Sequence, residues 1–201
     1  MLAFDDLPLN RDLFSRSDKV LTITGATWSD YEKFDSEEYP GYRVAYFQGE
    51  IIVVSPGLNH EIIVSVIDRL ILAYCDEYRL LEFPWRQTRL EQTGQAGREP
   101  DIAYSFQSRK SQPGLVVEVI FSSGDIDKLK ESYQNIGISE LWIWQKNEIC
   151  FFYLDSDRYR EIKTSRILPN IRAAGFVRFI NRGIKESPSI IKQDFLKIIR
   201  A

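Results

Sequence analysis

The stretch GLVVEVIF (residues 114–121) decides the fold prediction, because its apolar side chains fall on both alternating faces. That pattern is typical of a central strand in a sheet that is covered on both sides. Glu118 interrupts the run. A buried carboxylate without a partner is so unfavourable that Glu118 needs a cation, a basic side chain or a proton beside it. The sequence therefore predicts a polar site on a central strand.

The preceding stretch PDIAYSF (100–106) supplies a second carboxylate, Asp101. If the two stretches form a hairpin centred between residues 109 and 110, Asp101 lies opposite Glu118, with Cβ atoms roughly 5 Å apart. Two like charges at that distance repel each other unless a cation such as Mg²⁺ or Mn²⁺ lies between them. The alternatives are two carboxylates that face solvent at a sheet edge, or Glu118 held by an internal arginine.

Working outward, periodicity and turn residues predict the remaining elements. The expected helices span residues 27–36, 59–80, 126–136 and 189–199. Ser29 and Asn59 are the expected N-caps of the first two, and Gly137 ends the third. The expected strands span residues 21–24, 43–47, 50–55, 82–92, 100–106, 114–121, 141–145 and 148–154, with a polar turn over 93–99. This order favours an α/β (α+β) fold in which helices flank a mixed sheet.

Composition excludes several classes of protein. Hydrophobic residues make up 44% of the 201 residues and charged residues 27%, values typical of a soluble globular domain. No apolar stretch reaches the length of a membrane span, and the acidic N-terminus does not resemble a secretory signal. Two cysteines and one histidine exclude a zinc site of the Cys/His type and favour a reducing, cytoplasmic location. The net charge of −3 does not indicate a strongly basic nucleic-acid binder.

Three stretches together carry a resemblance to a known family: GYRVAYFQGEIIVVSPGLNHE, EPDIAYSF and GLVVEVIFSSGDIDKLKESYQNIGISELWIW. They resemble the Uma-type branch of the PD-(D/E)XK nuclease superfamily, and the similarity extends to RILPNI near the end. The resemblance implies a restriction-endonuclease-like domain over residues 27–175, preceded by an N-terminal lead-in (1–26) and followed by a C-terminal helical extension (176–201). It also implies a Mg²⁺-dependent endonuclease that hydrolyses the phosphodiester bonds of DNA.

The resemblance further implies which residues would hold the metal and supply the lysine. The metal would be held by Asp101, Glu118 and the main-chain carbonyl of Val119. The superfamily lysine stands two residues after the glutamate, but this branch moves it onto the following helix. Lys128 and Lys130 stand there, although neither matches the family position. We keep both as catalytic candidates and favour Lys130, which is nearer the apolar face of the predicted helix.

Glu50 and His60 complete the catalytic candidates that the resemblance implies. His60 could bind the metal through water or accept a proton; as alternatives, it is a surface or capping residue, and Glu50 is a surface strand residue. Arg98, Arg109 and Lys110 could line a rim that contacts the nucleic-acid backbone. Exposed loop charges without any function are the alternative for these three.

Three other functions remain open at this point. The chain could be a catalytically inactive nuclease-fold protein that binds nucleic acid or a protein partner. It could be an oligomeric scaffold, since the aromatic stretches LWIWQ and ICFFYL could form a dimer interface as well as a core. It could also be a different metal hydrolase. A homodimer would in turn suit an enzyme that cuts two-fold symmetric duplex DNA.

Overall fold

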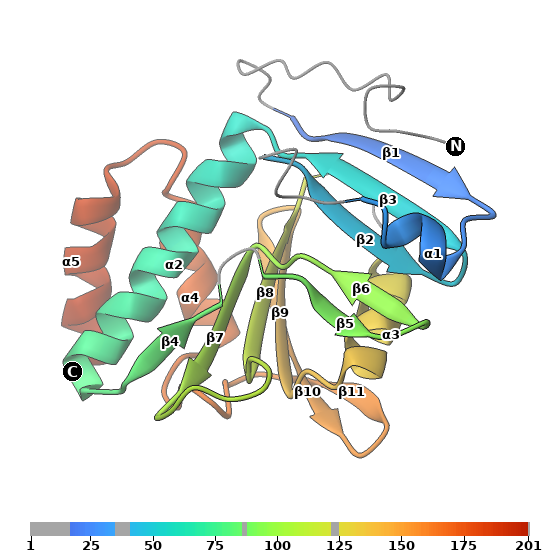
Figure 1. The fold of residues 1–201 in the computed structure, drawn as a ribbon. Coiled ribbons are helices and arrows are strands. Elements are labelled where there is room, and N and C mark those ends of the chain that lie inside the picture. The colour runs from blue at the N-terminus through green and yellow to red at the C-terminus, as the bar shows by residue number, and fades with distance from the viewer. Residues whose placement is uncertain (1–16, 35–40, 86–87, 122–124, 201) are drawn as a thin grey trace.

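The computed structural model describes residues 17–34, 41–85, 88–121 and 125–200, and within them it contains two sheets and five helices (Figure 1). Three sets of expectations lie partly outside the described residues: the lead-in over 1–16, the first helix over 35–36 and the strand over 86–87. Strands and helices alternate along the chain, which confirms the predicted α/β (α+β) class. In the described part of the chain, no helix is both long and apolar enough to cross a membrane.

A six-stranded sheet forms the centre of the fold, with strand order β11-β10-β9-β8-β7-β4. Its strands are β4 (Glu82–Pro84), β7 (Ile102–Phe106), β8 (Leu115–Ile120), β9 (Glu140–Gln145), β10 (Glu148–Asp155) and β11 (Arg158–Ile162). Strands β8 and β9 run parallel, because a helix connects them, whereas the other neighbours are antiparallel. The sheet is therefore mixed, as the sequence predicts, and β8 lies in its interior.

The register between β7 and β8 follows the hairpin that the sequence predicts. Ile102 pairs with Val117 and Tyr104 with Leu115. Continued by one residue, this register sets Asp101 opposite Glu118. Side chains alternate along a strand, so both carboxylates lie on the same face of the sheet.

A five-stranded sheet, with strand order β1-β3-β2-β6-β5, packs on that face together with α3. Its strands are β1 (Lys19–Thr24), β2 (Arg43–Phe47), β3 (Glu50–Ser55), β5 (Leu90–Gln92) and β6 (Ala96–Arg98). The expected turn of the β2–β3 hairpin is confirmed: Gln48 and Gly49 have φ of 48° and 77°, the left-handed values that a tight hairpin turn requires. Figure 1 shows this sheet on the opposite side of the molecule from α5.

Helices cover both faces of the central sheet. They are α1 (Trp28–Tyr31), α2 (Leu58–Tyr78), α3 (Ile126–Ile136), α4 (Ala173–Ile180) and α5 (Pro188–Ile199). Both expected N-caps are wrong. Thr27 caps α1 in place of Ser29, because its hydroxyl and the Asp30 carboxylate satisfy each other's backbone N–H groups in a capping box. Gly57 precedes α2, so Asn59 already lies in its first turn.

Three further features differ from the sequence-based expectation. The strand expected over 82–92 is two short strands, β4 and β5, which belong to different sheets. The turn expected over 93–99 contains β6, whose short pairing with β2 gives no periodic signal in the sequence. Strand β11 and helix α4 were not anticipated. By contrast, the end of α3 at Gly137, where φ is 89°, is confirmed.

The largest part of the core lies between the six-stranded sheet and α2, α4 and α5. Trp142 of β9 stacks on Phe151 of β10 with ring centroids 4.1 Å apart, and Phe176 of α4 packs edge-on against Trp142. Helix α2 contributes eight buried residues to this cluster, and Phe195 anchors α5 to it. This side of the sheet is filled by apolar side chains over most of its area, and Asp101 and Glu118 lie on the other side.

Candidate functional site

A pocket of about 360 Å³ lies between the two sheets, beside the first turns of α2 and α3. The five-stranded sheet contributes one wall, on which the apolar side chains of β1 and β3 face the cavity. Charged and ionisable side chains gather on the remaining lining. They are Asp18, Arg43, Glu50, His60, Arg98, Glu99, Asp101, Glu118, Asp125 and Lys128. The pocket therefore contains more carboxyl groups than basic groups.

Asp101 is the most tightly held of these carboxylates, and its side chain is only 3% exposed. Its Oδ2 accepts a hydrogen bond from the Val119 backbone N–H at 2.9 Å. Its Oδ1 accepts one from Arg43 Nε at 3.1 Å and lies 2.9 Å from His60 Nε2. Burial alone would raise the pKa of Asp101, but these donors and the positive charges outweigh it and hold the pKa below its usual value. Asp101 is therefore ionised.

Glu118 projects from β8 into the same pocket and has the opposite character. Its Oε1 accepts a hydrogen bond from the Tyr133 hydroxyl of α3. Burial, followed by the nearby charge of Asp101, raises the pKa of Glu118 to about 8. At neutral pH the pair therefore carries one charge and one proton, because burial and mutual repulsion outweigh the nearby charges of Arg98 and His60.

His60, in the first turn of α2, lies between two carboxylates. Its Nδ1 is 3.1 Å from Asp18 Oδ2, and its Nε2 faces Asp101. Burial would lower the pKa of His60, but the charges and hydrogen bonds of Asp101 and Asp18 raise it to about 10. With both ring nitrogens facing acceptors, His60 is a cation that donates to both carboxylates. It is buried, so it is not the surface residue that one alternative expected.

The two candidate lysines lie in different surroundings. Lys128 Nζ is 2.8 Å from Glu50 Oε2, and both side chains line the pocket. Lys130 lies outside the pocket lining, where its Nζ is 2.7 Å from Asp127 Oδ1 and 5.2 Å from the centre of the Phe152 ring. The structure therefore places Glu50 and Lys128 in the lining of the pocket that holds the acidic pair, and Lys130, which the helical pattern favoured, lies outside that lining.

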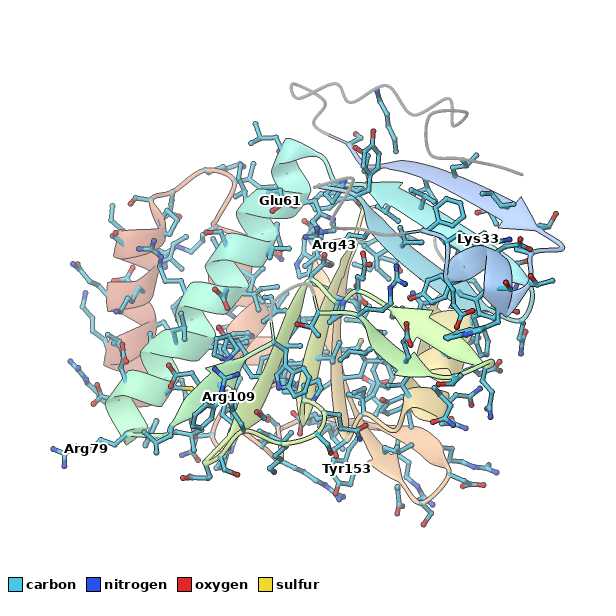
Figure 2. All side chains as sticks on the ribbon, viewed as in Figure 1. Lys33, Arg43, Glu61, Arg79, Arg109 and Tyr153 are labelled. Atoms are coloured by element: carbon cyan, nitrogen blue, oxygen red, sulfur yellow. The ribbon has the colours of Figure 1, made fainter. Side chains whose placement is uncertain are left out.

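The expected basic rim is only partly present at the pocket. Arg98 lines it, with its guanidinium 5.6 Å from the centre of the Tyr133 ring, whereas Arg109 lies over the Phe83 ring away from the lining. An internal arginine exists, as one alternative anticipated, but Arg43 holds Asp101 and not Glu118. Figure 2 shows Arg43 near Glu61, where β2 meets the first turn of α2; Arg43 Nη2 and Glu61 Oε1 are 3.5 Å apart.

Several residues of the pocket were not anticipated. Asp18 and Arg43 approach from strands or strand ends far from Asp101 in the sequence, and nothing in their own sequence context marks them. Glu99 is buried beside Asp101, and its Oε2 accepts a hydrogen bond from the Val44 backbone N–H. Its Oε1 has no hydrogen-bond partner among the described residues, although Arg89 Nε lies 3.6 Å from it. The sequence offered one sign of this: Glu99 stands two residues before Asp101, so on an extended chain both side chains point to the same face.

The donor chemistry limits the kind of metal site that the pocket can form. Among the described residues, no group of three or more His, Cys, Asp and Glu side chains is arranged to hold a metal ion. A cation would therefore depend on two carboxylates, a main-chain carbonyl and water. Mg²⁺ is often bound in this way, because it keeps several of its water ligands.

Comparison with known proteins identifies the family of this chain. The model of the Uma2 family, described as a putative restriction endonuclease, matches residues 28–176, more than half of the chain. The matched stretch contains Glu50, His60, Asp101, Glu118 and both lysines, whereas Asp18 precedes it. A comparison with curated proteins gives no match.

Proposed function

Because the chain belongs to the Uma2 family of putative restriction endonucleases, we propose that it is a Mg²⁺-dependent endonuclease that hydrolyses phosphodiester bonds of DNA in the pocket between the two sheets. One observation carries the proposal: Asp101 and Glu118 face each other on neighbouring central strands, where burial and the charge of Asp101 raise the pKa of Glu118. Structural carboxylates are more often paired one-to-one with basic side chains.

The donor set fits a hard divalent cation. Asp101, Glu118 and the main-chain carbonyl of Val119 would hold Mg²⁺ or Mn²⁺, since all three offer oxygen atoms. Such an ion would polarise a phosphodiester oxygen and lower the pKa of a bound water. A bound divalent cation would favour the ionised form of Glu118 and so lower its raised pKa.

The side chains around the pair have separate roles in this proposal. Arg43 and His60 fix Asp101 by donating to the same oxygen, so the carboxylate keeps one orientation. The Tyr133 hydroxyl holds Glu118 from the side of α3. Lys128 would exchange its partner Glu50 for a phosphate oxygen and stabilise the charge that develops there.

A specific observation also supports a second function, nucleic-acid or protein binding without cleavage. The superfamily lysine position is occupied by Ile120, and Asp101 already has two cationic partners. A homodimer is compatible with either function, and sedimentation would detect it. Only metal-dependent cleavage separates the enzyme from the binding protein.

The test combines Mn²⁺ binding by calorimetry with cleavage of plasmid and single-stranded DNA in Mg²⁺ and Mn²⁺. Asp101→Ala and Glu118→Ala should both abolish binding and cleavage. Glu148→Ala, which removes an exposed carboxylate from β10, is the matched control and should change neither. Binding without cleavage would support the second function, and absence of Mn²⁺ binding by the wild-type protein would refute the metal site.

A further inference from the structure

Asp18 lies immediately before β1, and its side chain is buried, with 3% exposed. Its two oxygens contact two different groups. Oδ1 accepts a hydrogen bond from the Gly57 backbone N–H at 2.9 Å, and Oδ2 lies 3.1 Å from His60 Nδ1. A buried carboxylate with one oxygen on a helix start and the other on an imidazole has two separable roles.

The first role is structural. Gly57 is the N-cap of α2 and has no side chain with which to accept a backbone N–H of the first turn. Asp18 brings a carboxylate to this helix start from a distant segment, where a negative charge is favourable. This contact fixes the position of the first turn, which carries His60.

The second role concerns the orientation of the imidazole. A ring held at Nε2 alone can still tilt about its hydrogen bond to Asp101. Held at both nitrogens, with 3.1 Å at Nδ1 and 2.9 Å at Nε2, the His60 ring has one orientation left. The partner at the outer nitrogen commonly decides where a histidine directs its inner one.

We propose that Asp18 is a positioning residue of the candidate site, which orients His60 so that Nε2–H stays on Asp101 Oδ1. The family comparison does not assign this role, because Asp18 precedes the matched residues 28–176. The contact itself is independent of catalysis. Its consequence for metal binding rests on the proposed function.

Asparagine at this position separates the two roles. In Asp18→Asn, the amide oxygen can still accept the Gly57 N–H, so the start of α2 keeps its partner. The amide NH₂ replaces Oδ2, however, and cannot accept a hydrogen from His60 Nδ1. Asp18→Ala removes both contacts. A purely structural role predicts that Asn resembles wild type and only Ala differs, whereas the positioning role predicts that both variants change His60.

His60 is the only histidine of the chain, so its ring N–H signals can be assigned without ambiguity by NMR. In the metal-free wild-type protein we expect slowly exchanging signals from both Nδ1–H and Nε2–H. Asp18→Asn should lose the Nδ1–H signal, and its Nε2–H signal should shift or exchange faster with water, because Asp18 no longer helps to hold Nε2–H on Asp101. The control Asp30→Asn, which alters a carboxylate cap at α1, should keep both. An Nε2–H signal that stays unchanged in Asp18→Asn and in Asp18→Ala would overturn the proposal.

Calorimetry with Mn²⁺ then tests the consequence. Removing a hydrogen-bond partner of a metal ligand typically weakens metal binding about 10- to 100-fold. Asp18 acts on the ligand Asp101 only through His60, so we expect Asp18→Asn to weaken Mn²⁺ binding by at most about tenfold. Unchanged Mn²⁺ affinity would show that the orientation of His60 does not matter to the site. If the wild-type protein binds no Mn²⁺, the proposed function fails while the NMR result still decides the role of Asp18.

Discussion

The two faces of the six-stranded sheet are built from the same strands, yet they differ in packing and in the ionisable side chains that they bear. On the face toward α2, α4 and α5, Val117 and Trp142 belong to one continuous apolar cluster. On the face toward α3 and the five-stranded sheet, a smaller cluster gives way to a pocket that contains Asp101 and Glu118. Along β8, a step of one residue separates the two environments.

This difference teaches that stability and chemistry are separated across the sheet. The closed face contributes dispersion and the burial of apolar surface. Its buried carboxylate, Glu140, accepts hydrogen bonds from Trp142 and from two backbone N–H groups. The open face holds a carboxyl group at a raised pKa, which is unfavourable for folding unless a ligand binds. Substitutions on one face should therefore change stability and leave ligand binding intact, and substitutions on the other should do the reverse.

The largest expected effect is on the closed face. Phe151 is fully buried and stacks on Trp142, so Phe151→Ala should lower the free energy of unfolding by about 3–5 kcal/mol. Its neighbour Phe152 points to the other face and is only partly buried, so Phe152→Ala should lower it less. Denaturant unfolding measures both values.

Calorimetry on the folded fraction of Phe151→Ala completes this test, because Mn²⁺ affinity should match wild type. A variant that lost Mn²⁺ affinity while it remained folded would show that the two faces are coupled. The separation across the sheet would then be wrong.

The second effect compares two lysines on one helix. If Lys128 stabilises charge on the phosphate, Lys128→Ala should lower kcat by about 10²–10³-fold. Lys130→Ala is the matched control and should retain wild-type kcat, because Lys130 pairs with Asp127 outside the pocket. Single-turnover cleavage assays in Mg²⁺ measure both rates. Equal losses, or a loss only in Lys130→Ala, would contradict the assignment.

The pair of lysines also shows what the sequence could and could not predict. The acidic pair was predictable, because the two-residue period of strands and the short β7–β8 connection together determine that Asp101 faces Glu118. Lys130 was favoured because helical periodicity places a residue relative to the apolar face of its own helix. The pocket lies beside the first turn of α3, and the β2–β3 hairpin that carries Glu50 decides which lysine enters it.

Contacts between distant segments were beyond the reach of sequence patterns. Arg43, Asp18 and Glu99 meet the site through pairings that depend on how the two sheets pack, and no local period encodes that packing. The same reason explains why the stretch over 82–92 was taken as one strand. Strand β4 in its first half extends the six-stranded sheet, and strand β5 in its second half extends the five-stranded sheet.

The third and smallest effect is a pH dependence that arises at Glu118. Burial and the charge of Asp101 raise the pKa of Glu118 from 4.5 to about 8, so the metal-free site holds a proton at pH 6–7. Metal binding must release that proton. Mn²⁺ affinity should therefore rise with pH by up to about tenfold per unit and level off above the raised pKa.

Calorimetry at pH 6.5 in two buffers with different ionisation enthalpies counts the protons released, and we expect about one. Stability has the opposite sign: the folded state binds this proton more tightly than the unfolded state, so the metal-free protein loses stability as pH rises from 4.5 toward 8. Glu118→Gln should remove that loss and also remove Mn²⁺ binding, whereas Glu148→Gln should change neither. Mn²⁺ binding without proton release would mean that Glu118 is already ionised in the metal-free protein. The pKa of Glu118 would then not be raised, and Mn²⁺ affinity would not depend on pH through this group.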